Sequence, residues 1–111
     1  MDELITALTD TGLRFAHFGW SKAPDGDYGI FAERAANSIW ADGTMAEQNI
    51  IGTVEYYTRD ATRAIRDKIQ DALDAADVSW GLETVIFETD SGFIHYVWTF
   101  EAPVEGADEN G

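Results

Sequence analysis

The side chains of this chain that could bind a metal or transfer a proton are its histidines and carboxylates. His17 and His95 fall on two different expected strands, where they could meet across a sheet and bind a metal beside an acid. No HxH or HExxH spacing accompanies them, which favours core or interface positions instead. Glu83, Glu88 and Asp90 are close in sequence, but acid–base catalysis needs a pocket that shifts one pKa, and no pattern indicates such a pocket.

Other signatures of catalysis are missing from the sequence. It has no GxSxG, GxxxxGK[ST] or GxGxxG motif and no cysteine, and the loops at Asp25 and Asp42 lack the ligand spacing of a calcium site. The tryptophans could line a ligand pocket, although aromatic residues at strand spacing are more often core. They are Trp20, Trp40, Trp80 and Trp98. We therefore expect a protein without enzymatic activity or cofactor.

Charge is the most unusual part of the composition. The 111 residues include 21 acidic and 7 basic side chains, which give a formal net charge of −14. Such a surface repels phosphate backbones, so direct nucleic-acid binding is not expected, and solubility is the simplest use of the charge. The start of the chain lacks the pattern of a signal peptide, and no apolar run is long enough to span a membrane. These features predict a soluble, cytoplasmic protein.

Hydrophobic periodicity predicts one α+β domain over residues 1–102, in the order α-β-β-β-α-β-β. We expect a small mixed or antiparallel sheet with the helices packed on one face. The helices are expected over 2–11 and 61–76, and the strands over 13–20, 28–33, 50–58, 80–87 and 93–100. The last strand has apolar groups on both faces, which predicts a central position or cover by another subunit. The acidic segment 103–111 is expected to be a disordered tail.

Two Asp-Gly pairs, at 25–26 and 42–43, are strong local signals for hairpins. The first predicts that the strand at 28–33 returns along the strand at 13–20. The second has two interpretations: a long hairpin that places Trp40 opposite Met45 and Phe31 opposite Val54, or a loop with a helical turn at 45–48.

A projecting hairpin could not bury its own apolar residues, so it would need a partner. The candidate subunit interface is therefore Ile39, Trp40 and Met45, together with Tyr57 on the following strand. In the alternative, Trp40 folds back onto the core of its own domain.

The chain resembles the small tail-terminator, or tail-completion, proteins of long-tailed bacteriophages. The resemblance covers roughly residues 1–102 and follows the order helix, hairpin, long strand, helix, two strands. Its most family-like stretches are DYGIFAE at 27–33, ANSIWADG at 36–43 and TVEYYTRD at 53–60. These are loose patterns and none is catalytic.

The resemblance implies a homohexameric ring that ends growth of the tail tube and joins the tail to the head. It implies tail-tube and head-completion proteins as partners, and a place in the virion tail after assembly in the host cytoplasm. A ring whose opening passes DNA would benefit from a surface that repels it. Because a closed ring uses two different patches of each subunit, we expect the projecting hairpin at 36–48 to meet a sheet edge of its neighbour.

Two other functions fit parts of the sequence. An acidic decoy or immunity-type protein would use the negative charge to bind a basic partner, although the acids here are spread along the whole chain. A dimeric α+β barrel, either ligand-binding or enzymatic, would enclose an aromatic pocket between two sheets.

Overall fold

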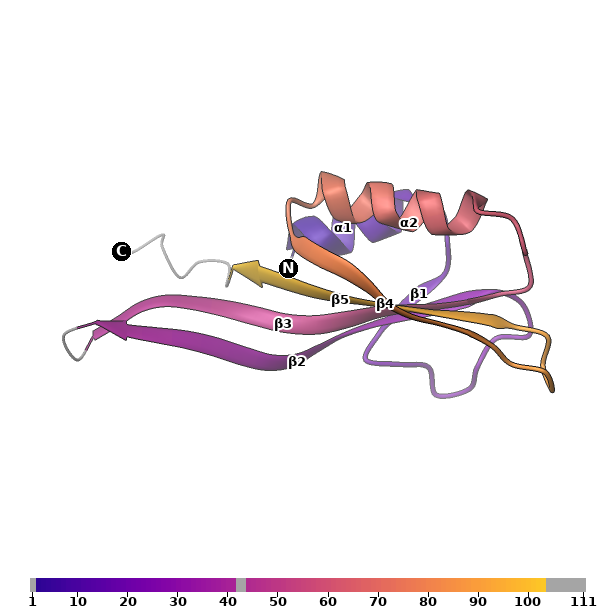
Figure 1. The fold of residues 1–111 in the computed structure, drawn as a ribbon, viewed down its shortest axis with the longest axis horizontal. Coiled ribbons are helices and arrows are strands. Elements are labelled where there is room, and N and C mark those ends of the chain that lie inside the picture. Colours follow the sequence, from indigo (N-terminus) through magenta and orange to yellow (C-terminus); the bar gives the residue numbers. More distant parts are fainter. Residues whose placement is uncertain (1, 42–43, 104–111) are drawn as a thin grey trace.

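The computed structural model describes residues 2–41 and 44–103, and side chains for all of these except 35–41, 44–48 and 103. The described residues form two helices and one five-stranded sheet (Figure 1). In chain order the elements are α1 (Asp2–Asp10), β1 (Phe15–His17), β2 (Tyr28–Ala41), β3 (Thr44–Thr58), α2 (Ala64–Ala75), β4 (Ser79–Phe87) and β5 (Ile94–Pro103). The predicted α+β class and element order are confirmed.

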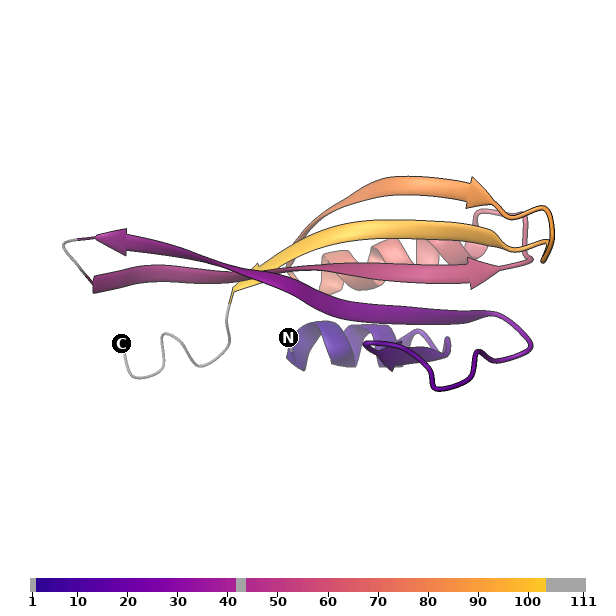
Figure 2. The same cartoon turned by 90° about the horizontal axis from the view of Figure 1, so that it is seen from below.

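The strands lie in the order β1-β2-β3-β5-β4, as Figure 2 shows from below. β1 is parallel to β2, and all the other neighbours are antiparallel. β5 pairs with β3 on one side and β4 on the other, so the predicted central position of the last strand is confirmed. The two edges of the sheet are therefore β1 and β4, which come from opposite halves of the chain.

Both helices cover the same face of the sheet (Figure 1). Alternate residues of β3 and β5 point into this face because side chains on a strand have a period of two. The buried side chains of this core, which come from α1, α2, β2, β3 and β5, include Leu4, Leu8, Phe31, Val54, Tyr56, Ile69, Leu73, Trp98 and Phe100. The indole Nε1 of Trp98 donates to Gln70 Oε1 at 3.1 Å, so the largest core residue is fully hydrogen-bonded. The expected packing of the helices on one face is confirmed.

The first Asp-Gly prediction is wrong, because β1 and β2 run in the same direction. Left-handed backbone at Phe18 (φ 70°) and Gly19 (φ 150°) ends β1 after three residues, well short of the strand predicted to reach residue 20. Residues 18–27 then lead back to the start of β1, where Gly29 N donates to the Arg14 carbonyl at 2.7 Å. The bend at 25–26 is real, but it lies inside a long loop instead of joining paired strands.

The second prediction is confirmed in its hairpin form. β2 and β3 pair antiparallel from Tyr28↔Tyr57 to Ala41↔Thr44, and the register places Phe31 opposite Val54 and Trp40 opposite Met45. The alternative helical turn at 45–48 is not formed, since these residues belong to β3. Residues 42–43 lie outside the described residues. The expected disordered tail at 103–111 also lies outside them, except for the backbone of Pro103, which ends β5.

Candidate assembly surfaces

The face of the sheet away from the helices carries a ladder of stacked rings. Tyr28, Tyr57 and His95 occupy matching positions on β2, β3 and β5, so their rings lie over one another. The ring centroids are 4.7 Å apart between Tyr28 and Tyr57 and 4.1 Å apart between Tyr57 and His95, with planes within 16° of parallel. Phe93 meets both tyrosines edge-on, and the guanidinium of Arg59 lies 4.0 Å from the Phe93 ring centroid.

Carboxylates surround the histidine end of this ladder. His95 Nε2 lies 2.8 Å from Glu55 Oε1, and His95 Nδ1 lies 3.8 Å from Glu88 Oε2. Burial, with help from Glu55, Tyr28 and Glu88, raises the pKa of Tyr57 to about 12. At neutral pH Tyr57 is therefore an uncharged phenol that contributes packing and a hydrogen-bonding hydroxyl group, not a base.

The two histidines do not meet. His17 stacks on Phe31, with ring centroids 4.6 Å apart, and Phe31 points to the helix-covered face. His95 stacks on Tyr57, which points to the opposite face. Among the described residues, no group of three or more His, Asp and Glu side chains is placed to hold a metal ion. The histidines instead each pair with a carboxylate, Glu33 for His17 and Glu55 for His95.

The three acids that are close in sequence also have separate surroundings. Glu83 is the extra residue at the bulge in β4 and is exposed. Glu88 accepts a hydrogen bond from the Ser91 hydroxyl at 3.2 Å, and Asp90 is an exposed loop residue. These three acids therefore do not form the shared pocket that acid–base catalysis requires.

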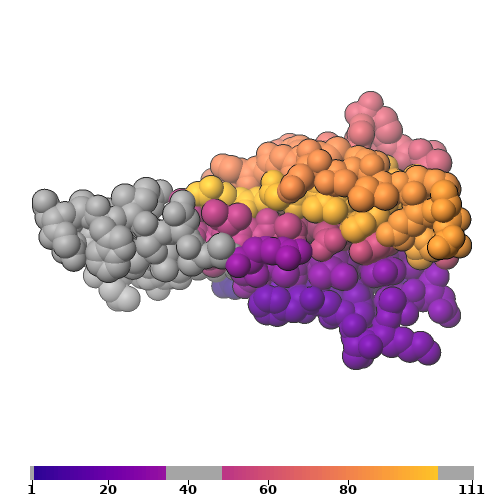
Figure 3. Space-filling model, turned by 60° about the horizontal axis from the view of Figure 1, so that its bottom comes forward, coloured from indigo at the N-terminus to yellow at the C-terminus, as the bar shows by residue number. Residues whose placement is uncertain are grey.

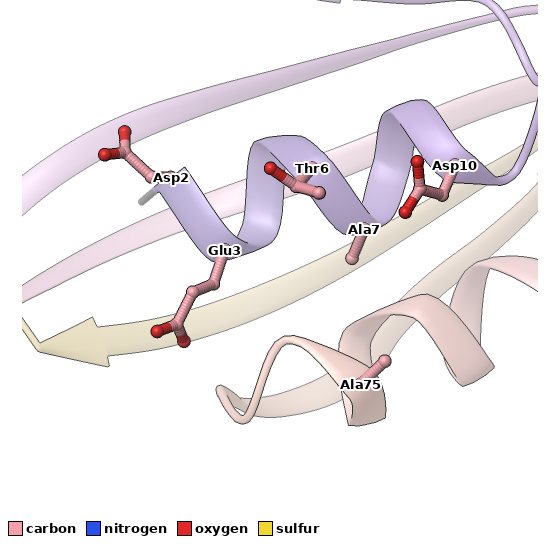
Figure 4. A pocket seen from close by; sticks show the side chains of 6 residues that line it. All are labelled: Asp2, Glu3, Thr6, Ala7, Asp10 and Ala75. Carbon is pink, nitrogen blue, oxygen red and sulfur yellow. The ribbon is translucent and has the colours of Figure 1, made fainter.

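A shallow hollow of about 380 Å³ lies between α1 and the end of α2 (Figure 4). It is lined by Asp2, Glu3, Thr6, Ala7, Asp10 and Ala75. Three of the six lining residues are acids, and the hollow is open to solvent.

Each described tryptophan has its own packing or hydrogen-bond partner, separate from those of the others. Trp98 is buried in the core, Trp80 Nε1 donates to Asp74 Oδ1 at 2.8 Å, and Trp20 Nε1 donates to the Gly29 carbonyl at 2.9 Å. Trp20 is at the β1 edge, whereas Trp80 and Trp98 are on β4 and β5. These three indoles therefore do not line one common pocket.

The predicted interface residues lie at two ends of the β2–β3 hairpin. Trp40 and Met45 are paired near its tip, with Ile39 beside them, whereas Tyr57 is at its base in the ring ladder. The structure thus separates Tyr57 from the other three residues. The ladder could not be expected from the residues alone, because it depends on the register of three strands.

The hairpin extends well beyond the body of the sheet (Figures 1 and 2). Pairing of β3 with β5 stops at Asn49↔Pro103, and pairing of β2 with β1 covers only residues 29–31. Among the described residues, the stretches 38–41 and 44–48 therefore have a strand partner only within the hairpin. We call these two stretches the arm.

No helix among the described residues is long and apolar enough to cross a membrane. Comparisons of the sequence with protein-family models and with curated proteins find no match.

Proposed function

We propose that this chain is a non-enzymatic ring subunit of a long-tailed bacteriophage, a tail terminator that ends growth of the tail tube and joins the tail to the head. The arm is the observation that carries the proposal. A two-stranded hairpin without further packing is only marginally stable in water. An arm of this length therefore gains stability from contact with another chain, which is what a ring supplies.

A closed ring needs two different patches on each subunit that fit each other. The arm is one such patch in this proposal, and a sheet edge of the neighbouring subunit receives it. The arm contains three large apolar residues for that contact, Ile39, Trp40 and Met45. Homohexamers are the assembly that the resemblance to tail terminators favours.

The charge of the chain supports a structural role around DNA. A net charge of −14 per subunit gives a hexamer a strongly negative surface, and negative walls repel a DNA backbone instead of holding it. DNA would then pass through the ring without binding to it. The partners in this proposal are the tail-tube and head-completion proteins, and the location is the virion tail, after assembly in the host cytoplasm.

The mass of the protein in solution tests the ring. We would measure it by sedimentation or light scattering across a wide concentration range, with and without millimolar Mg²⁺, which screens repulsion between acidic subunits. We expect a species of six subunits whose population rises with Mg²⁺. A stable dimer would favour the barrel that encloses a pocket. A monomer under all conditions would contradict self-assembly and favour the decoy that binds a basic partner.

A substitution in the arm tests which element joins the subunits. Trp40→Ala should weaken assembly while the monomer stays folded, because the arm extends beyond the body of the sheet (Figure 1). Ser38→Ala, also on the arm, is the matched control and should assemble like the wild type. A Trp40→Ala monomer that unfolds would show that Trp40 belongs to the core, which would contradict the role of the arm.

A further inference from the structure

The exposed large apolar side chains of the described residues fall in two short segments. Phe18 and Trp20 lie in the loop that follows β1, and the others lie on β4. Those on β4 are Leu82, Val85, Ile86 and Phe87. Because β1 and β4 are the two edges of the sheet, the apolar groups are on opposite sides of the molecule (Figure 2). We call residues 14–22 the basic edge and residues 82–90 the acidic edge, for the charges described next.

The two edges carry opposite charge. Arg14 and Lys22 lie in a stretch, residues 11–24, that contains no acid. No Lys or Arg follows Lys68, so the acidic edge has Glu83, Glu88 and Asp90 and no cation of its own. The cation beside it is Arg59, which donates to the Ser91 carbonyl at 3.0 Å. Neither Arg14 nor Lys22 forms an ion pair with a carboxylate of the described residues; Arg14 instead donates to the Asp27 carbonyl at 2.8 Å. Both of these positive charges are therefore available to an acidic partner surface.

The basic edge also holds a strained residue. Phe18 has φ 70°, a left-handed conformation that bulky side chains rarely adopt, and the residue is 66% exposed. The ring stacks on His17, with centroids 4.2 Å apart, and Phe18 N donates to the Phe31 carbonyl at 2.8 Å. These contacts fix an exposed aromatic ring in a costly backbone conformation. Such strain is typical of residues retained for contact with a partner.

The acidic edge has only part of the usual protection of an exposed strand. Natural edge strands are guarded by Lys, by Pro, by bulges or by very short length. β4 has nine residues and neither Lys nor Pro, and its bulge at Glu83 leaves the stretch 84–87 regularly paired and unprotected. Phe87 is 62% exposed, and its neighbour Ile86 points to the opposite face of the sheet, so this end of β4 is apolar on both sides. Figure 3 shows β4 in orange along one border of the open face.

We infer that the acidic edge of one copy packs against the basic edge of a second copy, head to tail, with Phe87 near Phe18 and Glu83 near Lys22. A contact between two different patches leaves a free patch on each copy, so it can continue into a ring. The inference rests on the proposed ring function and names the surfaces that join the bodies of its subunits. The arm extends along the strand direction (Figure 2). Among the described residues, 32–37 of β2 have no strand partner on the β1 side and lie outside both edges, so this part of the sheet stays free to receive the arm and both contacts can form in one ring.

A charge swap tests the pairing. Lys22→Glu and Glu83→Lys change exposed residues whose side chains make no hydrogen bond to a described residue, so each variant should fold. Each variant alone should associate several-fold more weakly, because two edges of like charge then face each other. The double variant Lys22→Glu/Glu83→Lys restores opposite charges and should recover assembly, as should an equal mixture of the two single variants. Full assembly by both single variants would overturn this pairing and leave the ring function standing.

The apolar part of the contact has its own test. Phe87→Ser should weaken assembly about tenfold or more if Phe87 is central to the contact. Phe18→Gly should weaken assembly as well and should also raise the thermal stability of the monomer, since glycine adopts a positive φ without strain. A merely structural role for Phe18 would not combine these two effects. A variant that loses stability, or that assembles like the wild type, would contradict the role given to Phe18.

Cysteine trapping distinguishes the edge contact from ring formation. The chain has no cysteine, so a mixture of Phe18→Cys and Phe87→Cys can form disulfides only at the introduced sites. Under mild oxidation we expect heterodimers, in excess over those from the control mixture of Thr6→Cys, on the exposed side of α1, with Phe87→Cys. Heterodimers without a six-subunit species would support the edge contact and count against the ring. Heterodimers no more abundant than the control would overturn the edge contact, whether or not the wild type forms a ring.

Discussion

Successive side chains of each strand point alternately to the helix-covered face and to the open face of the sheet. On β5, Trp98 is fully buried beneath the helices, while its neighbour Val97 points to the other face and is only partly buried. The covered face is held by burial of large apolar groups, which contributes most of the folding free energy. The open face is held by stacked rings and hydrogen bonds such as His95–Glu55. One face thus supports the fold, and the other is left to solvent or to a partner.

Truncating one side chain on each face should give the largest difference in unfolding free energy. Trp98→Ala removes a fully buried indole and should cost about 3–5 kcal/mol of unfolding free energy, because the surrounding core cannot fill the cavity. Val97→Ala, next to it on the open face, should cost less than about 1 kcal/mol. Urea denaturation of both variants measures the difference. Equal losses would show that the open face is as important to the fold as the covered one.

Added methyl groups probe the same contrast at two glycines. A Cβ at Gly52 would lie 2.3 Å from the carbonyl oxygen of Ala32 and 2.6 Å from the Phe100 ring, and a backbone oxygen cannot easily move away. Gly52→Ala should therefore cost about 1–3 kcal/mol. At Gly81 nothing lies within 4 Å, so Gly81→Ala should change the stability by less than about 0.5 kcal/mol. A tolerated Gly52→Ala would mean that β2 and β3 can separate locally.

Tyr56 and Tyr57 extend the comparison to pH. Burial, and to a lesser extent Asp27, raises the pKa of Tyr56 on the covered face to about 12. The unfolded chain loses this proton near pH 10 while the folded protein keeps it, so stability falls as pH rises from 10 to 12. Tyr56→Phe should reduce that fall by about 1 kcal/mol at pH 11, and Tyr57→Phe by less because water reaches the open face. Urea denaturation at pH 8 and pH 11 measures how much unfolding free energy is lost as pH rises. An equal loss in the wild type and in Tyr56→Phe would contradict the burial argument.

The smallest effect is expected for the charges of the open face. Glu55→Gln keeps a hydrogen-bond acceptor for His95 but removes the carboxylate 3.8 Å from Arg34 Nη2. Because these groups are partly solvated, the cost should stay within about 1 kcal/mol and should shrink in 1 M salt. The matched change Glu33→Gln tests the other His–Glu pair. A salt-independent loss of several kcal/mol would mean that the open face holds a buried charge network.

The sequence predicted the elements of this fold well and their long-range pairing less well. Apolar residues on both faces of β5, such as Trp98 and Val97, predicted a central strand or cover by another subunit, and β5 does lie between β3 and β4. The Asp-Gly pair at 42–43 predicted the β2–β3 hairpin because the strands on both sides are long and close in sequence. The pair at 25–26 misled, since a local bend does not determine which strands pair across a ten-residue loop.

The candidate surfaces depended on information that the sequence does not contain. The apolar spacing of Val85, Ile86 and Phe87 is that of any strand, and only the sheet order shows that β4 is an edge. Likewise, nothing in the residues around Phe18 indicates its positive φ, because a bulky side chain rarely adopts this conformation. The charge difference between residues 14–22 and 82–90 is visible in the sequence. It indicates a contact between two copies only because these residues lie at opposite edges of the sheet.

The central place of β5 has a consequence for how the protein is made. Ribosomes synthesise a chain from its N-terminus at roughly 5–20 residues per second, and β5 emerges after the other described elements. Until it does, β3 is paired only with β2, and β4 has no partner, because β3 and β4 are joined only through β5. A nascent chain stopped before residue 94 would therefore present one unpaired side of β3 and an unpaired β4 that other copies could join.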